Sequence, residues 1–234
     1  MVTILIDLAV IGTVAFCGWR GFKGGLIRGA FGVVSIIVAL LVANIAAQAY
    51  YGETKGMLMP FVGGIIDSTM TEVAEDGVEY QALAHDHEVE DADFGVAYMT
   101  LRQLGLPEAA AVSIAEKSIE IEEDERDGYF SDVIADRLST AFSYVAVFGI
   151  AFLLLAIVFA VIGNLVGVVF ALPGFKYIDM ISGSVLGLFK GVMIVYTAAV
   201  IVRYFGLLFL PILERTTLLR YIVNNNPIAN ILGV

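Results

Sequence analysis

The chain of 234 residues is 59% hydrophobic and only 16% charged, with a mean hydropathy of +0.87. Soluble domains are closer to half apolar and a quarter charged, so this composition excludes a disordered chain and disfavours an ordinary cytosolic enzyme. The net charge of −11 is unevenly spread, because residues 51–139 hold 21 of the 24 acidic residues and 5 of the 13 basic ones. The sequence therefore predicts two slightly basic membrane blocks around an acidic insert, without the basic stripe that binding to nucleic acid would require.

Four apolar segments are long enough to cross a lipid bilayer. Residues 2–19 are apolar apart from Asp7, and the charge-free run 29–52 follows them. After the insert we expect a third helix over about 140–170 and a fourth within 178–208, because a hydrocarbon core of roughly 30 Å needs about 20 apolar residues. The predicted fold class is therefore an all-α membrane protein with four transmembrane helices arranged as two hairpins.

This organisation divides the chain into four parts. They are a first transmembrane hairpin at 1–50, an acidic extracytoplasmic insert at 51–139, a second hairpin at 140–208 and an interfacial C-terminal tail at 209–234. The turn after the first span carries Arg20, Lys23 and Arg28 and no acidic residue. Because short loops rich in Lys and Arg face the cytoplasm, we expect the 20–28 turn inside and both the N-terminus and the insert outside.

Helical spacing marks two segments of the insert. Phe94, Ala97 and Leu101 recur at helical intervals before Gly105, and Pro107 suits the start of a further helix. The insert is therefore predicted to be a helical cap, or partly disordered segments lying on the outer membrane surface. One group has the residue types of a metal site, namely His85, His87, Glu88, Glu90, Asp91 and Asp93, but the spacing of a four-ligand site is missing. We expect no metal ion and no cofactor.

An internal repeat links the two membrane blocks. Residues 21–29 read GFKGGLIRG and residues 183–191 read GSVLGLFKG, so both copies place three glycines four residues apart and a base before the last one. Glycines at this spacing form a flat strip on one helix face, which lets another helix approach closely. The predicted helix-packing positions, including two on the third span, are Gly21, Gly25, Gly29, Gly163, Gly167, Gly183, Gly187 and Gly191.

Two motifs carry a family resemblance. The first is Ile6-Asp7 followed by Gly18-Trp19-Arg20-Gly21-Phe22, and the second comprises Asp179, Gly183, Gly187, Lys190 and Gly191. Over about 1–50 and 140–206 the chain resembles the colicin V production protein (CvpA) family, with lysine at position 190 where that family often has arginine. The resemblance implies a multi-pass bacterial inner-membrane protein linked to the production or export of a peptide toxin. The short family members have no comparable insert, so the insert inherits no role.

Three classes of function follow from these features. The resemblance favours a non-enzymatic component that supports colicin V production, toxin export or envelope homeostasis. The alternative is a small oligomeric channel or transporter, which is indicated by ionisable residues in or near the spans. These intramembrane or interfacial charges are Asp7, Arg20, Arg28, Asp179, Lys190 and Arg203. An intramembrane enzyme is disfavoured, because the apolar blocks contain no Ser–His–acid triad, and we expect no catalytic residues.

The expected partners are the lipid bilayer, a second copy or another membrane protein, and an external protein that meets the insert. Two of the charges also suggest contacts within the chain. Asp7 lies 13 residues before Arg20, and Arg203 lies 13 residues after Lys190. Because the first and fourth spans run in opposite directions, Asp7 and Arg203 are expected at similar depth in the outer half of the membrane. An Asp7–Arg203 ion pair is therefore one hypothesis, and separate exposure of the two side chains at the outer interface is the other. Asp179 is expected to face the macrodipole at the start of its own helix.

Overall fold

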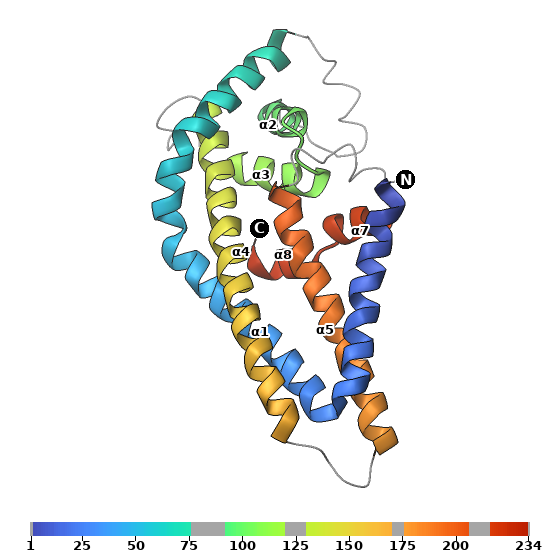
Figure 1. The fold of residues 1–234 in the computed structure, drawn as a ribbon. Coiled ribbons are helices and arrows are strands. Elements are labelled where there is room, and N and C mark those ends of the chain that lie inside the picture. Colours follow the sequence, from blue (N-terminus) through green and yellow to red (C-terminus); the bar gives the residue numbers. More distant parts are fainter. Residues whose placement is uncertain (1, 76–91, 120–129, 170–175, 206–215, 234) are drawn as a thin grey trace.

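The computed structural model describes residues 2–75, 92–119, 130–169, 176–205 and 216–233, which are almost entirely helical and contain no strand. In chain order the helices are α1 (Val2–Glu75), α2 (Ala92–Gln103), α3 (Glu108–Ile119), α4 (Phe130–Val169), α5 (Lys176–Phe205), α7 (Leu218–Asn224) and α8 (Pro227–Leu232) (Figure 1). The all-helical prediction is therefore confirmed for the described residues.

Helix α1 consists of two arms joined at Gly25. This glycine has φ 73° and ψ −179°, a left-handed φ that an L side chain rarely adopts, and the chain reverses direction there (Figure 1). We call residues 2–24 the first arm and residues 26–75 the second arm. The Gly25 turn, the end of α4 and the start of α5 lie together at one end of the molecule, the narrow end. The N-terminus and helices α2 and α3 lie toward the opposite, broad end.

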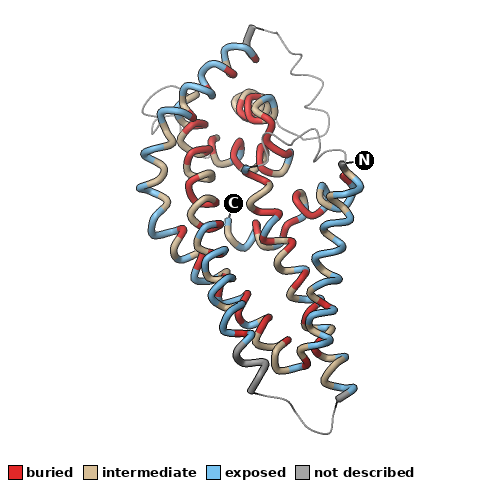
Figure 2. Tube along the Cα trace, in the orientation of Figure 1, coloured by how far each residue is buried: buried red, intermediate tan, exposed pale blue. Residues whose placement is uncertain are grey.

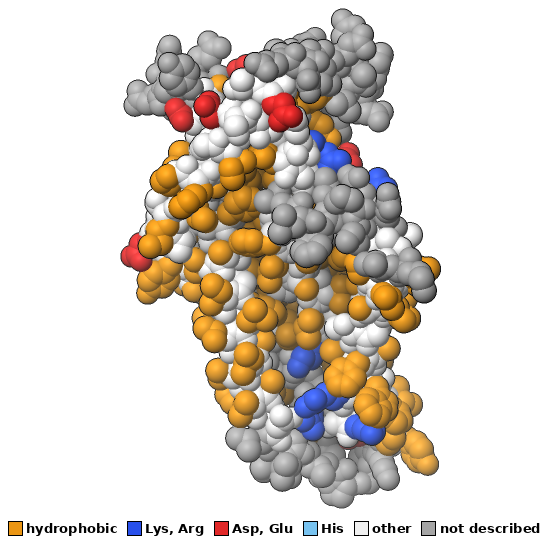
Figure 3. All heavy atoms as spheres, turned by 45° about the horizontal axis from the view of Figure 1, so that its top comes forward, with side chains coloured by type: hydrophobic (Ala, Val, Ile, Leu, Met, Phe, Trp, Pro, Cys, Tyr) orange, Lys and Arg blue, Asp and Glu red, His pale blue; other side chains and the backbone are white. Residues whose placement is uncertain are grey.

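Three of the helices, α1, α4 and α5, are long and apolar enough to cross a membrane, over Thr3–Val73, Phe130–Asn164 and Tyr177–Phe205. They also leave large apolar side chains exposed, including Leu8 on the first arm, Ile45 on the second arm, Ile157 on α4 and Ile181 on α5. Figure 3 shows hydrophobic side chains spread along the flanks of the molecule. Exposed apolar surface of this extent would be unfavourable in water, whereas in a bilayer it faces lipid. The chain is therefore a membrane protein.

The main hydrophobic core lies toward the broad end. Leu101 of α2, Leu106 of the turn that follows it and Ile114 of α3 are buried together with Ile66 of the second arm and Val145 of α4. Buried segments accordingly gather between the long helices there (Figure 2). The helical pattern predicted for the insert is confirmed, with α2 ending before Gly105 and α3 beginning after Pro107. Both helices are part of the core, packed with the second arm and α4.

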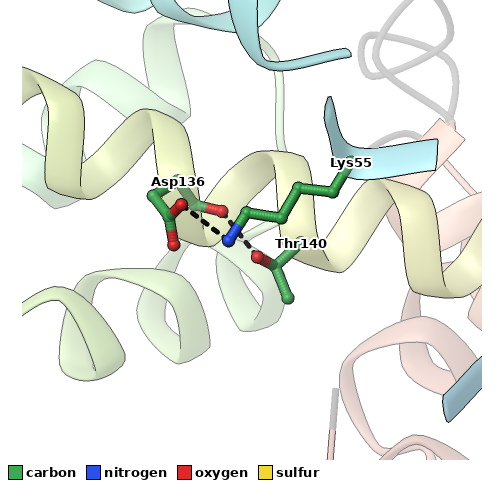
Figure 4. Close-up of polar contacts among 3 residues, drawn as sticks. All are labelled: Lys55, Asp136 and Thr140. Atoms are coloured by element: carbon green, nitrogen blue, oxygen red, sulfur yellow. Dashed lines mark hydrogen bonds and ion pairs between the residues drawn. The ribbon is translucent and has the colours of Figure 1, made fainter. Parts of the chain in front are cut away.

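The long helices extend past the ends that hydropathy predicted. The second arm continues beyond residue 52 to Glu75, and α4 begins at Phe130, before the expected start near 140. At about 1.5 Å per residue the second arm is about 75 Å long, much longer than a hydrocarbon core. Lys55 Nζ and Asp136 Oδ1 join the two extensions at 2.6 Å, and the Thr140 hydroxyl donates to the Asp136 carbonyl oxygen (Figure 4). Hydropathy thus marks the most apolar part of each helix, and the helix itself continues beyond it.

Of the six residues with metal-ligand character, His85, His87, Glu88, Glu90 and Asp91 lie outside the described residues, and Asp93 lies in the first turn of α2. Within the described ranges, no group of three His, Cys, Asp or Glu side chains is placed to hold a metal ion.

Candidate functional site

The two copies of the internal repeat lie against each other at the narrow end. A Cβ atom added to Gly183 of α5 would lie 2.5 Å from the carbonyl oxygen of Gly21 and 2.6 Å from the carbonyl carbon of Gly25. One turn later, a Cβ on Gly187 would collide with the carbonyl oxygen of Cys17, and a further turn on, Gly191 lies against Val14 of the first arm. The glycine strip of α5 therefore packs backbone to backbone along the first arm of α1.

The other predicted packing glycines lie on the second arm and on α4. A Cβ on Gly29 would be 3.3 Å from the Cα of Gly183, so the second arm also approaches the α5 strip. A Cβ on Gly163 would be 3.2 Å from the Phe31 ring, which places α4 against the second arm. Gly167 lies one turn further along α4. Repeat glycines from both blocks thus converge where the two arms of α1 meet α5, which sequence spacing alone could not specify.

A basic cluster surrounds this contact. Arg20 of the first arm donates from Nη2 to Oδ1 of Asn164 at 3.0 Å, and Arg28 of the second arm donates to the same oxygen. Together with Lys190 of α5, these arginines line a cavity of about 70 Å³, which Cys17 also borders. Figure 3 shows basic side chains gathered near one another in this region, among hydrophobic ones. We call Arg20, Arg28 and Lys190 with Asn164 the narrow-end cluster.

Two residues of this arrangement carried no site prediction. Asn164 lies on α4 as the common acceptor of two arginines, although the sequence showed it only as part of a Gly-Asn pair. Gly32 makes room for Lys190, since a Cβ there would be 3.2 Å from Lys190 Cδ and 3.4 Å from its Nζ. The one signal that could have indicated Gly32 is its position three residues after Gly29, a spacing that places two residues on the same side of a helix.

Asp179 has a more specific role than the one expected from its position. It lies in the first turn of α5, as predicted, but its Oδ1 accepts a hydrogen bond of 2.7 Å from the backbone N–H of Leu26. Leu26 is the first residue after the Gly25 break, so its N–H has no partner one turn earlier in the same arm. Asp179 therefore caps the second arm of α1 and ties the turn of the first hairpin to the start of α5.

The predicted Asp7–Arg203 ion pair is not formed. Asp7 accepts hydrogen bonds from the backbone N–H groups of Thr217, Leu218 and Leu219 at 3.1–3.3 Å, so it caps the start of α7. Arg203 is 5% exposed and donates from Nη2 to the carbonyl oxygen of Ala109 in α3. The prediction was wrong because it considered only contacts between the first and fourth spans, whereas α3 and α7 supply the partners.

The C-terminal tail packs on α5. Ile222 and Val223 of α7 are buried against Val195 and Ala199. Asn226, which is 1% exposed, caps α8 by accepting from the N–H groups of Ile228 and Ala229, and its Nδ2 donates to the carbonyl oxygen of Tyr196 at 2.8 Å. The described part of the tail is thus held by polar contacts to α1 and α5 as well as by apolar packing.

The comparisons with known proteins agree with the second motif. Residues 127–227 match the family model described as Colicin V production protein, and this range contains α4, α5, α7, Asn164 and the glycine strip of α5. No curated protein and no solved structure matches the chain. The resemblance seen in residues 140–206 is therefore confirmed, because this part of the chain matches the model of the colicin V production protein family.

Proposed function

We propose that the chain crosses the bacterial inner membrane four times, as two hairpins, with the narrow end in the cytoplasm. Each arm of α1 would be one span, and α4 and α5 would be the other two. The reversal at Gly25 supports this layout, and so do Arg20, Lys23 and Arg28, which follow the rule that short basic loops face the cytoplasm. In this orientation the N-terminus and the acidic residues 51–139 are outside.

Cysteine labelling tests the orientation directly, because Cys17 is the only cysteine in the chain. In a Cys17→Ser background, single cysteines replace Lys23 in the hairpin turn and Asp91 in the insert. An impermeant maleimide added to intact cells should label position 91 and leave position 23 unlabelled until the cells are lysed. Labelling of position 23 in intact cells would refute the orientation.

The proposed function is that of a non-enzymatic membrane component that supports the production or export of a colicin V-type toxin, or envelope homeostasis. The observation that carries this proposal is the family match over 127–227. The geometry is consistent with a structural component, because Asp7 and Asp179 both cap helices. Its partners would be a second copy or another membrane protein within the bilayer, and an external protein at the insert.

Gene deletion in a toxin-secreting strain tests this function. Toxin activity in the medium should fall on deletion, and should return with the wild-type chain. The Gly187→Leu variant should not restore it, whereas the control Gly12→Leu should, since a Cβ at Gly12 meets nothing within 4 Å. Unchanged secretion on deletion, together with saturable solute flux in proteoliposomes, would instead favour the channel or transporter.

A further inference from the structure

The narrow-end cluster concentrates positive charge at one small site. Arg20, Arg28 and Lys190 come from the two arms of α1 and from α5, and all three line the same cavity. Like charges that line one small cavity repel one another, and the repulsion is stronger beside a low-dielectric layer. Their shared partner Asn164 is neutral, so it can orient the two guanidinium groups but cannot balance their charge.

No carboxylate neutralises these bases within the described part of the chain. The ion pair between Lys55 and Asp136 involves none of the three. Asp179, the nearby acid on α5, accepts the N–H of Leu26. Residues 170–175, which connect α4 to α5, contain neither Asp nor Glu. The cluster therefore has an excess of positive charge that an anion from outside the chain can balance.

The cavity has the size of a small oxoanion. At about 70 Å³ it has room for roughly five water molecules, since each needs about 10–15 Å³ of this kind of volume. Gly21, Gly29 and Gly187 form part of its wall, and an added Cβ at each of them would press against α5 or the first arm, so the glycines let the three helical segments that carry the bases come close together. Side chains that carry the charge thus surround a small space beside the close glycine contact.

We propose that this cavity binds a phosphate group, which Arg20, Arg28 and Lys190 hold between the two hairpins. Guanidinium groups bind phosphate oxygens through paired charge-assisted hydrogen bonds, and the lysine ammonium adds a point charge. The cluster lies at the end of the apolar helices, where phospholipid headgroups and the aqueous phase are both within reach. A phosphodiester of an anionic lipid and free inorganic phosphate therefore present the same chemistry to it. This proposal does not depend on a role in toxin production.

Cys17 provides a built-in reporter, because it borders the cavity and is the chain's single cysteine. The full-length protein is reconstituted in phosphatidylcholine nanodiscs, and the rate of Cys17 modification by methyl methanethiosulfonate is measured. Two additions are compared: inorganic phosphate in solution, and phosphatidylglycerol as an increasing fraction of the lipid. Saturable slowing by phosphatidylglycerol alone identifies a lipid phosphodiester as the ligand, and slowing by inorganic phosphate identifies a soluble anion.

Lys190→Gln is the test variant and Lys23→Gln is its matched control. Both remove one positive charge from the same end of the molecule, but Lys23 lies 4.0 Å over the Trp19 ring and does not line the cavity. Loss of one charge-assisted contact should raise the half-protecting ligand concentration about 10-fold in Lys190→Gln, with less than about a twofold change in Lys23→Gln. Arg28→Gln serves as a second test variant if Lys190→Gln does not give a folded protein.

Two results would overturn the proposal. One is that neither phosphate nor phosphatidylglycerol slows the modification of Cys17 in the wild-type protein. The other is that the protection weakens equally in the control Lys23→Gln and in the test variant, which is Lys190→Gln or, in its place, Arg28→Gln. Equal weakening would mean that the anions respond only to the overall positive charge of this end.

Discussion

Replacing Gly183 with alanine tests the backbone contact that joins the two copies of the repeat. The added Cβ would lie 2.5 Å from the carbonyl oxygen of Gly21, 2.6 Å from the carbonyl carbon of Gly25 and 2.7 Å from its oxygen, where ordinary contacts begin at 3.4 Å. The first hairpin and α5 must then separate by about 1 Å, and a gap of that size removes up to about half of the dispersion energy of each atom pair across it. Overpacking of this kind costs about 2 kcal/mol.

Thermal unfolding of the purified protein in detergent measures this cost. A loss of about 2 kcal/mol corresponds to a decrease in Tm of about 4–8 °C for a chain of this size. Gly12→Ala is the matched control, because it makes the same substitution in the first arm of α1, where a Cβ meets nothing within 4 Å. Since alanine is favoured over glycine in a helix by up to about 1 kcal/mol, this control should unfold at the wild-type temperature or above it. If Gly183→Ala is as stable as Gly12→Ala, the close contact between the repeats does not exist.

Three further substitutions test the polar contacts. Asp179→Ala should lower the free energy of unfolding by about 1 kcal/mol and Asp179→Asn by less, because asparagine can still accept the Leu26 N–H; equal losses would show that the charge matters and the cap does not. The double variant Asp7→Arg with Arg203→Asp should have a lower Tm in detergent than either single variant, because each of the two residues has its own backbone partner. Recovery of the Tm in the double variant would instead support the ion-pair hypothesis. Lys55→Gln should change the free energy of unfolding by less than about 1 kcal/mol, since this ion pair is partly exposed, and a larger loss in the same assay would mean that it holds the two extensions together.

Patterns that act within one helix were readable from the sequence. The apolar spacing of Phe94, Ala97 and Leu101, with Gly105 and Pro107 as punctuation, located α2 and α3 because helix periodicity and helix breakers are local properties. Helix length was less readable. The second arm continues to Glu75 through a segment of lower hydropathy, because a helix can leave the bilayer without unfolding when other helices pack against it.

Contacts between helices were not readable to the same degree. Glycine spacing identifies a surface that permits close approach, but the partner of Gly183 is set by how the first arm, the second arm and α5 fold together. The charged residues show the same limitation. Counting residues along the spans placed Asp7 and Arg203 at similar depth, yet each found a backbone partner on a short helix that span counting does not include. Backbone N–H and carbonyl groups at helix ends compete for charged side chains, and sequence spacing alone does not reveal which of them are nearby.

Acidic and basic residues have different roles in the parts of the chain outside residues 51–139. Outside residues 51–139 the chain has three acidic residues, and the two that the structure describes, Asp7 and Asp179, both accept backbone N–H groups at helix starts. A carboxylate placed there is stabilised by the helix dipole and needs no basic partner. The eight bases in the same regions then exceed the acids that remain to pair with them, and three of these bases converge on one cavity at the narrow end. Helix capping by Asp179 thus leaves the narrow-end cluster with the positive charge that makes an external phosphate its natural counterion.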